Sequence, residues 1–283
     1  MENLCDLHVH SLFSDGTLTP TQIIDMAHDL GLGAIALTDH NTVDGLDEFI
    51  CAAKKKNMTA VPGSEFSADF EDRELHILGL FIPEKHFVTV TQLMAESQRR
   101  KDISNRELIA SLRGEGIALD YDEIKSATPS GQINRAHIAA ALMQKGYTSS
   151  IKQGFEKYLS PDGKHYKRPA RLSAAEIIDF IISIGALPVL AHPLLTLDER
   201  GLLHFLNSPQ SKNLCGMECY YSSYDAAKTQ VALQIATEYG LIASGGSDFH
   251  GTAKPDIMLG VGKGDLRVPF ECYLNLENAF RQK

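Results

Sequence analysis

The sequence predicts an α/β protein with a parallel sheet. Two observations support this: short apolar runs recur along the chain, and helix signals lie between most of them. With 43% hydrophobic and 22% charged residues among 283, the composition is that of an ordinary globular protein. The apolar runs, each a predicted strand, are residues 4–10, 34–40, 59–66, 75–81, 187–193, 216–221 and 241–250.

Helix starts are marked by local signals between these runs. Pro20 follows Thr19 at a first helical position, and Ser173 with Glu176 has the spacing of a capping box. Residues 87–171 break the alternation and have the pattern of consecutive helices, with 132–145 the clearest. We therefore expect one α/β domain from residues 1–86 and 172–283, and an inserted helical domain from residues 87–171.

Targeting signals are missing from the sequence. No apolar run approaches the roughly 20 residues that cross a bilayer, and the N-terminus lacks the basic and apolar regions of a signal peptide. We expect a cytoplasmic location and no membrane partner. The 5 cysteines form no C-x-x-C pair, which predicts core thiols rather than disulfides or a sulfur-ligated zinc site.

Charge is distributed unevenly around a net value of −9. Residues 86–171 hold 14 Lys or Arg against 9 Asp or Glu, whereas the remainder holds 13 against 27. An acidic body suits cation binding, and a basic segment suits an anionic substrate. Scattered solvated charge explains the asymmetry equally well when it is taken alone. The net acidity argues against a large nucleic-acid partner.

Histidines and carboxylates cluster at the ends of the predicted strands. His8 and His10 end the first strand, and residues two apart in an extended chain point the same way, so both rings can bind one ion. Asp15 follows in the adjoining loop. Other histidines and carboxylates end later predicted strands: Asp39, His40, Glu65, His192, Asp248 and His250. His76 begins the fourth predicted strand. Nitrogen and oxygen ligands converging in this architecture predict a metal site.

Each of these residues also has an ordinary structural explanation. A lone histidine near a strand end is usually hydrogen-bonded in the core or on the surface, and a lone Asp-Gly is usually a turn. The joint pattern favours the metal site. Histidines outside the pattern are assigned no function, and His137 is left open; the former are His28, His86, His165 and His204.

The motifs resemble those of the PHP superfamily, named for polymerase and histidinol phosphatase. They are His8-Val-His10-Ser-x-x-Ser-Asp15-Gly, Thr38-Asp39-His40-Asn, Gly63-x-Glu65, Leu75-His76-Ile-Leu-Gly, Ala191-His192-Pro193 and Gly245-Gly-Ser-Asp248-Phe-His250. They run in the family's order from residue 4 to about 250. The resemblance implies a distorted seven-stranded β/α barrel with an inserted helical cap domain that binds substrate.

The resemblance also implies two to three divalent ions. One would be held by His8, His10, Glu65 and Asp248; a second by Glu65, His76 and His192; and a third by Asp15, His40 and His250. Imidazole mixed with carboxylate and without sulfur fits manganese, iron or zinc. We expect Asp39 to support the loop or a metal-bound group from behind the ligands.

The expected chemistry is hydrolysis of a phosphate ester. Metal ions would neutralise phosphate oxygens and lower the pKa of a bridging water, so that hydroxide attacks phosphorus and no protein nucleophile is needed. Asn134-Arg135-Ala-His137 resembles the Arg-x-His of a subgroup acting on nucleoside 3′,5′-bisphosphates or monophosphates. This resemblance makes Arg135 and His137 candidate substrate-binding residues. Arg168 and Arg171, in a basic loop before the fifth strand, are secondary candidates for binding an anion, and Ser222, just after the sixth strand, is equally suited to line the pocket or to cap the helix that follows.

Other functions remain compatible with the sequence. A 5′-to-3′ exonuclease acting on short oligoribonucleotides would use the same chemistry on a diester. Histidinol-phosphate hydrolysis is weaker, because the family members with that activity lack a helical insertion at this position. A non-catalytic metal- or nucleotide-sensing module would be expected to lack some ligands, whereas every ligand position is filled here. No obligate protein partner is indicated.

Overall fold

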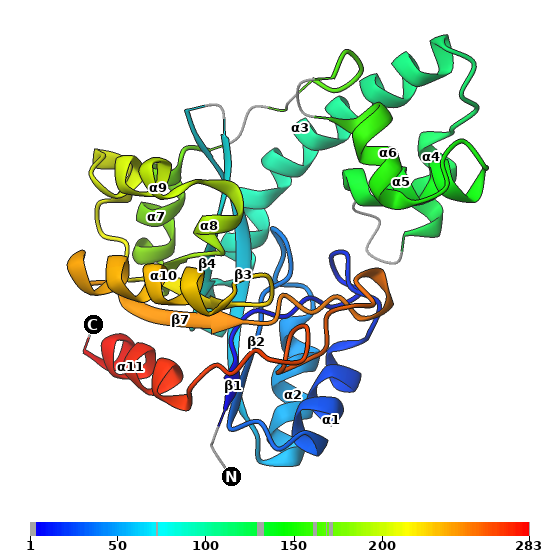
Figure 1. Cartoon of the computed structure of the whole chain (residues 1–283). Coiled ribbons are helices and arrows are strands. Elements are labelled where there is room, and N and C mark those ends of the chain that lie inside the picture. Colours follow the sequence, from blue (N-terminus) through cyan, green and yellow to red (C-terminus); the bar gives the residue numbers. More distant parts are fainter. Residues whose placement is uncertain are drawn as a thin grey trace. The chain divides into compact units, whose positions relative to one another are not determined.

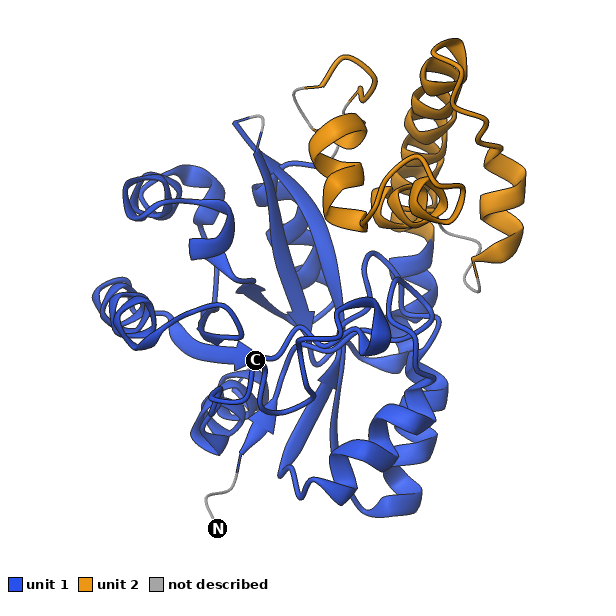
Figure 2. Ribbon diagram, turned by 45° about the vertical axis from the view of Figure 1, so that its right-hand side comes forward, with its two compact units in different colours: residues 1–91, 172–283 blue, residues 92–171 orange. Residues whose placement is uncertain are grey.

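The computed structural model of the chain divides into two compact units. The barrel unit comprises residues 1–91 and 172–283, and the helical unit comprises residues 92–171 (Figure 2). The structure describes residues 4–71, 73–128, 133–160, 163–167, 169 and 172–282.

The barrel unit is built on one sheet whose described strands follow chain order from β1 to β7 (Figure 1). The strands are β1 (Cys5–Asp6), β2 (Ala34–Leu37), β3 (Thr59–Phe70), β4 (Arg73–Leu80), β5 (Leu187–Leu190), β6 (Gly216–Tyr221) and β7 (Ile242–Gly246). Each lies within or overlaps one of the apolar runs. The regular strands at the two ends of the sheet are shorter than their runs.

The sheet curls until its first and last strands meet. Leu7 N–H donates to the carbonyl of Gly245 at 3.1 Å, and Val9 forms a parallel bridge with Phe249. These bonds satisfy backbone groups that an open sheet would leave exposed at both edges. The expected distorted seven-stranded β/α barrel is confirmed.

The expectation of a parallel sheet is wrong for β4. This strand runs antiparallel to both β3 and β5, whereas the other neighbouring pairs are parallel. Only a short turn separates β3 from β4, and a parallel connection needs a dozen or more residues. Because β4 is reversed, its first half lies at the edge where the parallel strands end, and His76 is part of that half.

Two helices of the barrel unit, α1 and α7, begin at the predicted signals. Thr19 and Gln22 form a capping box ahead of Pro20, and Ser173 forms one with Glu176. The helices of the barrel unit are α1 (Pro20–Asp29), α2 (Leu46–Lys56), α7 (Ala174–Ser183), α8 (Pro193–Thr196), α9 (Glu199–Leu206), α10 (Ala226–Glu238) and α11 (Phe270–Arg281). Short 3-10 turns are η1 (Glu84–His86), η3 (Pro209–Ser211) and η4 (Gly251–Ala253).

The helical unit has a core of its own. Its helices are α3 (Phe87–Gly114), α4 (Tyr121–Ala127), α5 (Arg135–Gln144), α6 (Ile151–Gly154) and the π-helical turn η2 (Phe155–Leu159). Leu108, Leu112, Ile138 and Leu142 are fully buried in one cluster with residues from α4 and η2. α3 begins before the boundary between the two units and continues through it.

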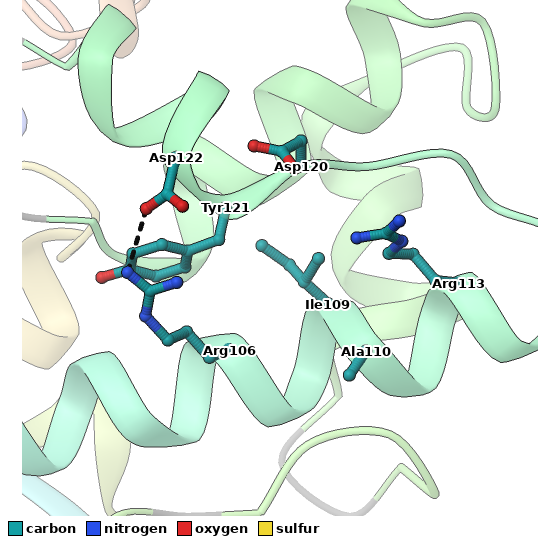
Figure 3. A pocket seen from close by; sticks show the side chains of 7 residues that line it. All are labelled: Arg106, Ile109, Ala110, Arg113, Asp120, Tyr121 and Asp122. Carbon is teal, nitrogen blue, oxygen red and sulfur yellow. Dashed lines mark hydrogen bonds and ion pairs between the residues drawn. The ribbon is translucent and has the colours of Figure 1, made fainter.

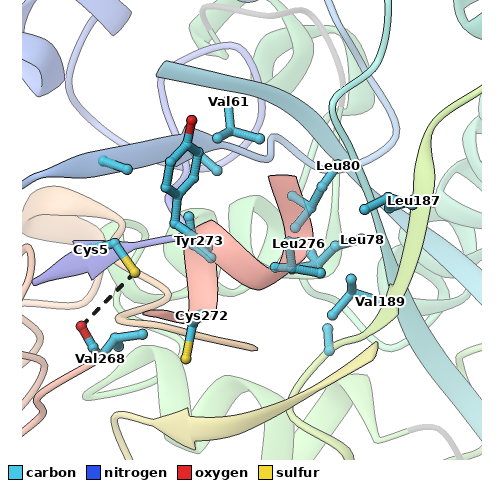
Figure 4. Packing of buried hydrophobic residues seen from close by; sticks show 14 of the residues in the cluster. Cys5, Val61, Leu78, Leu80, Leu187, Val189, Val268, Cys272, Tyr273 and Leu276 are labelled. Carbon is cyan, nitrogen blue, oxygen red and sulfur yellow. Dashed lines mark hydrogen bonds between the residues drawn. The ribbon is translucent and has the colours of Figure 1, made fainter. Parts of the chain in front are cut away.

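A buried apolar cluster fills the inside of the barrel and contacts α11 (Figure 4). It joins Cys5 and Leu7 beside β7 to Leu78 and Leu80 of β4. Strands so far apart in the sheet can share one cluster only across the barrel interior. Leu276 of α11 is fully buried in the same cluster, so this helix closes the core.

The described residues contain no helix with both the length and the apolar character needed to span a bilayer.

We predict that Leu276→Ala lowers the free energy of unfolding by about 2–5 kcal/mol, because it leaves a cavity in the barrel core. Leu274→Ala is the matched control, since Leu274 lies on the same helix with 39% of its surface exposed. That control should change stability by no more than about 0.5 kcal/mol. Urea denaturation followed by circular dichroism measures both, and equal losses would contradict the packing described for α11.

Candidate metal centre

The first and last predicted motifs lie side by side where the barrel closes. Asp248 N–H donates to the carbonyl of His8 at 2.9 Å, and His10 N–H donates to the carbonyl of Phe249 at 2.9 Å. A Cβ on Gly246 would lie 2.4 Å from the Cβ of His8, so only glycine allows this approach. The strand pairing therefore brings His8 and His10 to Asp248 and its neighbour His250.

Glu65 lies at the centre of the cluster and is 1% exposed. On β3 it faces the same side as Val61, which belongs to the barrel core, because the two are four residues apart in an extended strand. Its Oε2 lies 3.2 Å from Nε2 of His8, 3.2 Å from Nε2 of His10 and 3.0 Å from Nδ1 of His40. The side of β3 that contributes Val61 to the apolar core therefore also contributes Glu65 to the polar cluster.

The other oxygen of Glu65 faces a second pair of histidines. Oε1 lies 2.7 Å from Nδ1 of His76 and 3.0 Å from Nε2 of His192. His76 comes from the reversed strand β4, and His192 directly precedes α8. Glu65 is therefore placed to bridge two groups of ligands.

A third group surrounds Asp15. Its carboxylate lies 3.2 Å from Nε2 of His250, 3.7 Å from Nδ1 of His10 and 3.8 Å from Nε2 of His40. These four residues offer ligand atoms within 4.8 Å of one another. Asp15 is reached by a loop rather than by a strand, so its position depends on how that loop is held.

Asp39 holds the loop that carries Asp15. It accepts hydrogen bonds from the backbone N–H of Ser11 at 2.7 Å, from the Ser11 hydroxyl at 2.6 Å and from the Ser14 hydroxyl at 2.5 Å. The Asp39 carboxylate is 2% exposed, and burial raises its pKa, although these donors and His10 oppose the shift. Asp39 thereby ties the Asp15 loop to the end of β2.

Asp248 uses its two oxygens differently. Oδ1 lies 3.2 Å from Nε2 of His10, whereas Oδ2 accepts a hydrogen bond from the Tyr221 hydroxyl at 2.8 Å and pairs with Lys254 Nζ at 2.7 Å. The backbone of Asp248 has a φ of 56°, which is uncommon for a residue other than glycine. Tyr221 and Lys254, which our sequence analysis did not include, therefore fix the carboxylate with one oxygen toward the histidines.

Electrostatic interactions lower the pKa of two of the buried carboxyl groups, those of Glu65 and Asp15. Burial alone would raise the pKa of Glu65, but the His40 and His76 rings hold it well below its usual value. Burial of Asp15 is likewise outweighed by His40 and His250, so its pKa is also well below the usual value. Carboxylates in this state can bind a cation at neutral pH.

The donor set fits a divalent cation. Glu65 Oε2 is buried and has three imidazole nitrogens within 3.2 Å, yet it accepts no hydrogen bond from any described residue. Nδ1 of His76 and Nδ1 of His192 are also buried without a described hydrogen-bond partner. Unsatisfied buried polar atoms are rare in proteins. Nitrogen and oxygen atoms that converge without hydrogen-bonding suit ions of the manganese, iron or zinc type.

The sequence analysis also missed Glu218, in the middle of β6. Its side chain is fully buried, with Oε1 3.1 Å from Nδ1 of His8 and Oε2 accepting the backbone N–H of His192 at 2.7 Å. No motif marks this residue, because it sits inside the apolar run 216–221. The one available signal is a carboxylate within an otherwise uncharged strand.

The predicted substrate-binding residues that the structure describes belong to both units. Ser222 is 6% exposed, and its hydroxyl donates to the carbonyl of Ser247 at 2.5 Å, so it links the end of β6 to the segment before Asp248. Arg168 and Arg171 lie outside the described residues.

Arg135 and His137 lie in the helical unit at the start of α5. His137 forms a capping box with Asn134. The Arg135 guanidinium donates to the carbonyl of Leu159 at 3.2 Å and lies 4.5 Å from the centre of the Tyr166 ring. These contacts hold the arginine against the core of its own unit.

The helical unit also contains a cleft between α3 and α4, with a volume of about 370 Å³ (Figure 3). Arg106 stacks 3.8 Å from the centre of the Tyr121 ring and pairs with Asp122 at 2.9 Å. Both the ring and the carboxylate thus engage this guanidinium. We assign no ligand to the cleft, because acidic and basic side chains both line it.

Relatives of known sequence cover most of this chain. A 5′-3′ exoribonuclease of Haemophilus influenzae is 31% identical over 87% of this chain and 89% of its own length. A 3′,5′-nucleoside bisphosphate phosphatase of Chromobacterium violaceum is 33% identical over 87% of this chain and 86% of its own. A crystal structure of a candidate metal-dependent phosphoesterase from Bifidobacterium adolescentis has a TM-score of 0.82, with 25% identity, and covers 97% of this chain and 95% of that one.

The match to a family model is consistent with these relatives. The model described as PHP domain matches residues 6–167, which include the last residue of β1, all of β2 to β4 and most of the helical unit. Together with relatives at 30% identity or more that align over most of the chain, this match confirms the resemblance predicted from the motifs. The chain belongs to the PHP domain family.

Proposed function

We propose that the protein is a metal-dependent phosphoesterase that hydrolyses a phosphomonoester of a small nucleotide, either a nucleoside 3′,5′-bisphosphate or a nucleoside monophosphate. One observation carries the proposal: three imidazole nitrogens surround Glu65 Oε2 in a buried site without donating hydrogen bonds to it. A purely structural cluster would satisfy these atoms with hydrogen bonds.

Two to three divalent ions, manganese, iron or zinc, would be held by three groups of ligands. These are His8, His10, Glu65 and Asp248; then Glu65, His76 and His192; and then Asp15, His40 and His250. Such ions neutralise phosphate oxygens and make water acidic enough to supply the nucleophile near neutral pH. The distances between the members of each group support this assignment.

The chain's own residues supply position and charge. Asp39 keeps the loop in place so that Asp15 faces His250, and Tyr221 with Lys254 keeps Asp248 Oδ1 facing His10. Preorganised charge of this kind lowers the barrier because little reorganisation is needed during the reaction.

The substrate class rests on the relatives and on the helical unit. The Chromobacterium violaceum relative acts, by its name, on nucleoside bisphosphates. Arg135 at the start of α5 would bind the phosphate, because a guanidinium can donate two parallel hydrogen bonds to one phosphate group. His137 of the same turn, Ser222, and Arg168 and Arg171 are further candidates for substrate contacts.

A second function is favoured by one specific comparison. The Haemophilus influenzae relative is named a 5′-3′ exoribonuclease and aligns with 87% of this chain. Hydrolysis of a phosphodiester at the 5′ end of a short RNA would use the same site.

A substrate panel separates the two functions. We expect the manganese-loaded protein to release inorganic phosphate from a nucleoside 3′,5′-bisphosphate or a nucleoside 5′-monophosphate, and EDTA to abolish this release. A 5′-phosphorylated RNA pentamer is incubated in parallel, with products resolved by ion-exchange chromatography. Stepwise release of mononucleotides from the pentamer, without phosphate release from the mononucleotides, would move the assignment to an exoribonuclease.

We predict that Glu65→Gln lowers kcat/KM by more than about 100-fold, because loss of a shared ligand should exceed the 10–100-fold typical of residues that only support ligands. Glu238→Gln is the control, since its carboxylate is exposed on α10 and bonds only Gln234 among the described contacts. Phosphate release under saturating manganese measures both variants. Activity within a few-fold of wild type in Glu65→Gln would exclude the bridging role.

We predict that Arg135→Ala raises KM by about 10- to 100-fold while kcat changes little, as expected for the loss of charged hydrogen bonds to bound phosphate. Arg106→Ala removes an arginine of the same unit that is engaged by Tyr121 and Asp122, and its KM should match wild type. Steady-state kinetics measures KM and kcat of both variants, and melting temperatures show whether they fold. An equal rise of KM in both variants would contradict phosphate binding by Arg135.

A further inference from the structure

Glu218 lies behind the candidate ligands rather than among them. Its side chain is fully buried, with 0% of its surface accessible to solvent. Oε1 faces Nδ1 of His8, the ring nitrogen on the side away from Glu65, and Oε2 accepts the backbone N–H of His192. We propose that Glu218 is a positioning residue that orients both of these ligands, an inference that rests on the proposed metal-dependent function.

The contact with His8 determines which ring nitrogen carries the proton. Carboxylate oxygens accept hydrogen bonds, so the 3.1 Å contact between Oε1 of Glu218 and Nδ1 of His8 selects the tautomer in which Nδ1 donates. The lone pair of a neutral ring is then on Nε2, which lies 3.2 Å from Glu65 Oε2 and 3.0 Å from Nε2 of His10. A carboxylate–histidine pair of this geometry fixes the tautomer and the direction of a metal ligand.

The contact with His192 acts on the backbone. His192 has φ 29° and ψ 51°, a positive-φ conformation that is unfavourable for a residue with a side chain. Its N–H is held by Glu218 at 2.7 Å, and two residues later the N–H of Leu194 is held by the Tyr224 hydroxyl at 2.7 Å. These bonds keep the turn in the conformation that sends Nε2 of His192 to Glu65.

The two histidines that Glu218 contacts approach different oxygens of Glu65. His8 approaches Oε2 of Glu65, and His192 approaches Oε1. The two rings stack with centroids 5.6 Å apart and an interplanar angle of 20°. One buried side chain thereby aligns a ligand from each of two proposed metal groups.

A role in stability alone does not explain a carboxylate here. A buried charge is costly even when it is paired, and an apolar residue of similar volume often stabilises a core more. β6 is otherwise apolar at its buried positions, including Met217 and Cys219. Glu218 instead orients two groups, because its oxygens contact the ring of His8 and the backbone N–H of His192.

Glu218→Gln tests the role because the amide has nearly the same shape but only one acceptor oxygen. That oxygen can serve His8 or the His192 N–H, but not both, and the NH₂ group facing His8 would favour the tautomer with the proton on Nε2. We expect the affinity for Mn²⁺ alone, measured by isothermal titration calorimetry on metal-stripped protein, to fall about 10- to 100-fold. The visible absorption of the Co²⁺-loaded protein should change as well, because the ligand geometry changes.

Two further variants separate positioning from charge and from folding. Glu218→Asp keeps the charge but is one methylene shorter, so a general electrostatic effect predicts wild-type Mn²⁺ affinity and the positioning role predicts a loss. It also provides the readout if Glu218→Gln does not fold. Glu176→Gln removes an exposed carboxylate that caps α7, and it should bind Mn²⁺ as wild type does.

The outcomes distinguish this inference from the proposed function. Weakened Mn²⁺ binding in Glu218→Gln and Glu218→Asp, with melting temperatures of the metal-free proteins near wild type, is the expected result. Wild-type affinity and Co²⁺ spectra in both folded variants would overturn the positioning role while leaving the metal site intact. If the wild-type protein itself binds no Mn²⁺, the proposed metal-dependent function fails, and the role of Glu218 fails with it.

Discussion

The site depends on the pairing of the first strand with the last. Backbone hydrogen bonds between residues 7–10 and 245–249 close the barrel and place His8 and His10 beside Asp248. Gly246 makes this possible, because any larger residue would collide with the backbone of His8. Without closure the histidines of the N-terminal motif would lack the carboxylate that the C-terminal motif provides.

The cluster concentrates charge where proteins normally avoid it. Three of the buried carboxylates show how the charge is compensated: Glu65 faces imidazoles, Asp39 accepts from the serines of one loop, and Glu218 contacts a ring nitrogen and a backbone N–H. Such an arrangement sacrifices stability for geometry. The apolar cluster below it, which includes Leu78 and Leu276, provides the rigid support that holds these groups in place.

Much of this could be predicted from the sequence, because the strongest signals are local. Apolar runs marked each strand, Pro20 after Thr19 marked the start of α1, a capping box marked α7, and alternation placed His8 and His10 on one side. The direction of β4 was missed, since apolar content carries no information about orientation. Glu218 was missed for a related reason: its partners are 210 and 26 residues away, and only the folded barrel brings them to it.

The insertion between β4 and β5 has a consequence for how the protein is synthesised. Six proposed ligands leave the ribosome before the helical unit and three follow it: His8, His10, Asp15, His40, Glu65 and His76, and then His192, Asp248 and His250. The helical unit has its own core and can form while the barrel is still open. A nascent chain therefore exposes six of the nine proposed ligands while the helical unit is being synthesised. Its folding is completed by the last strand, when long-range pairing finally closes the barrel.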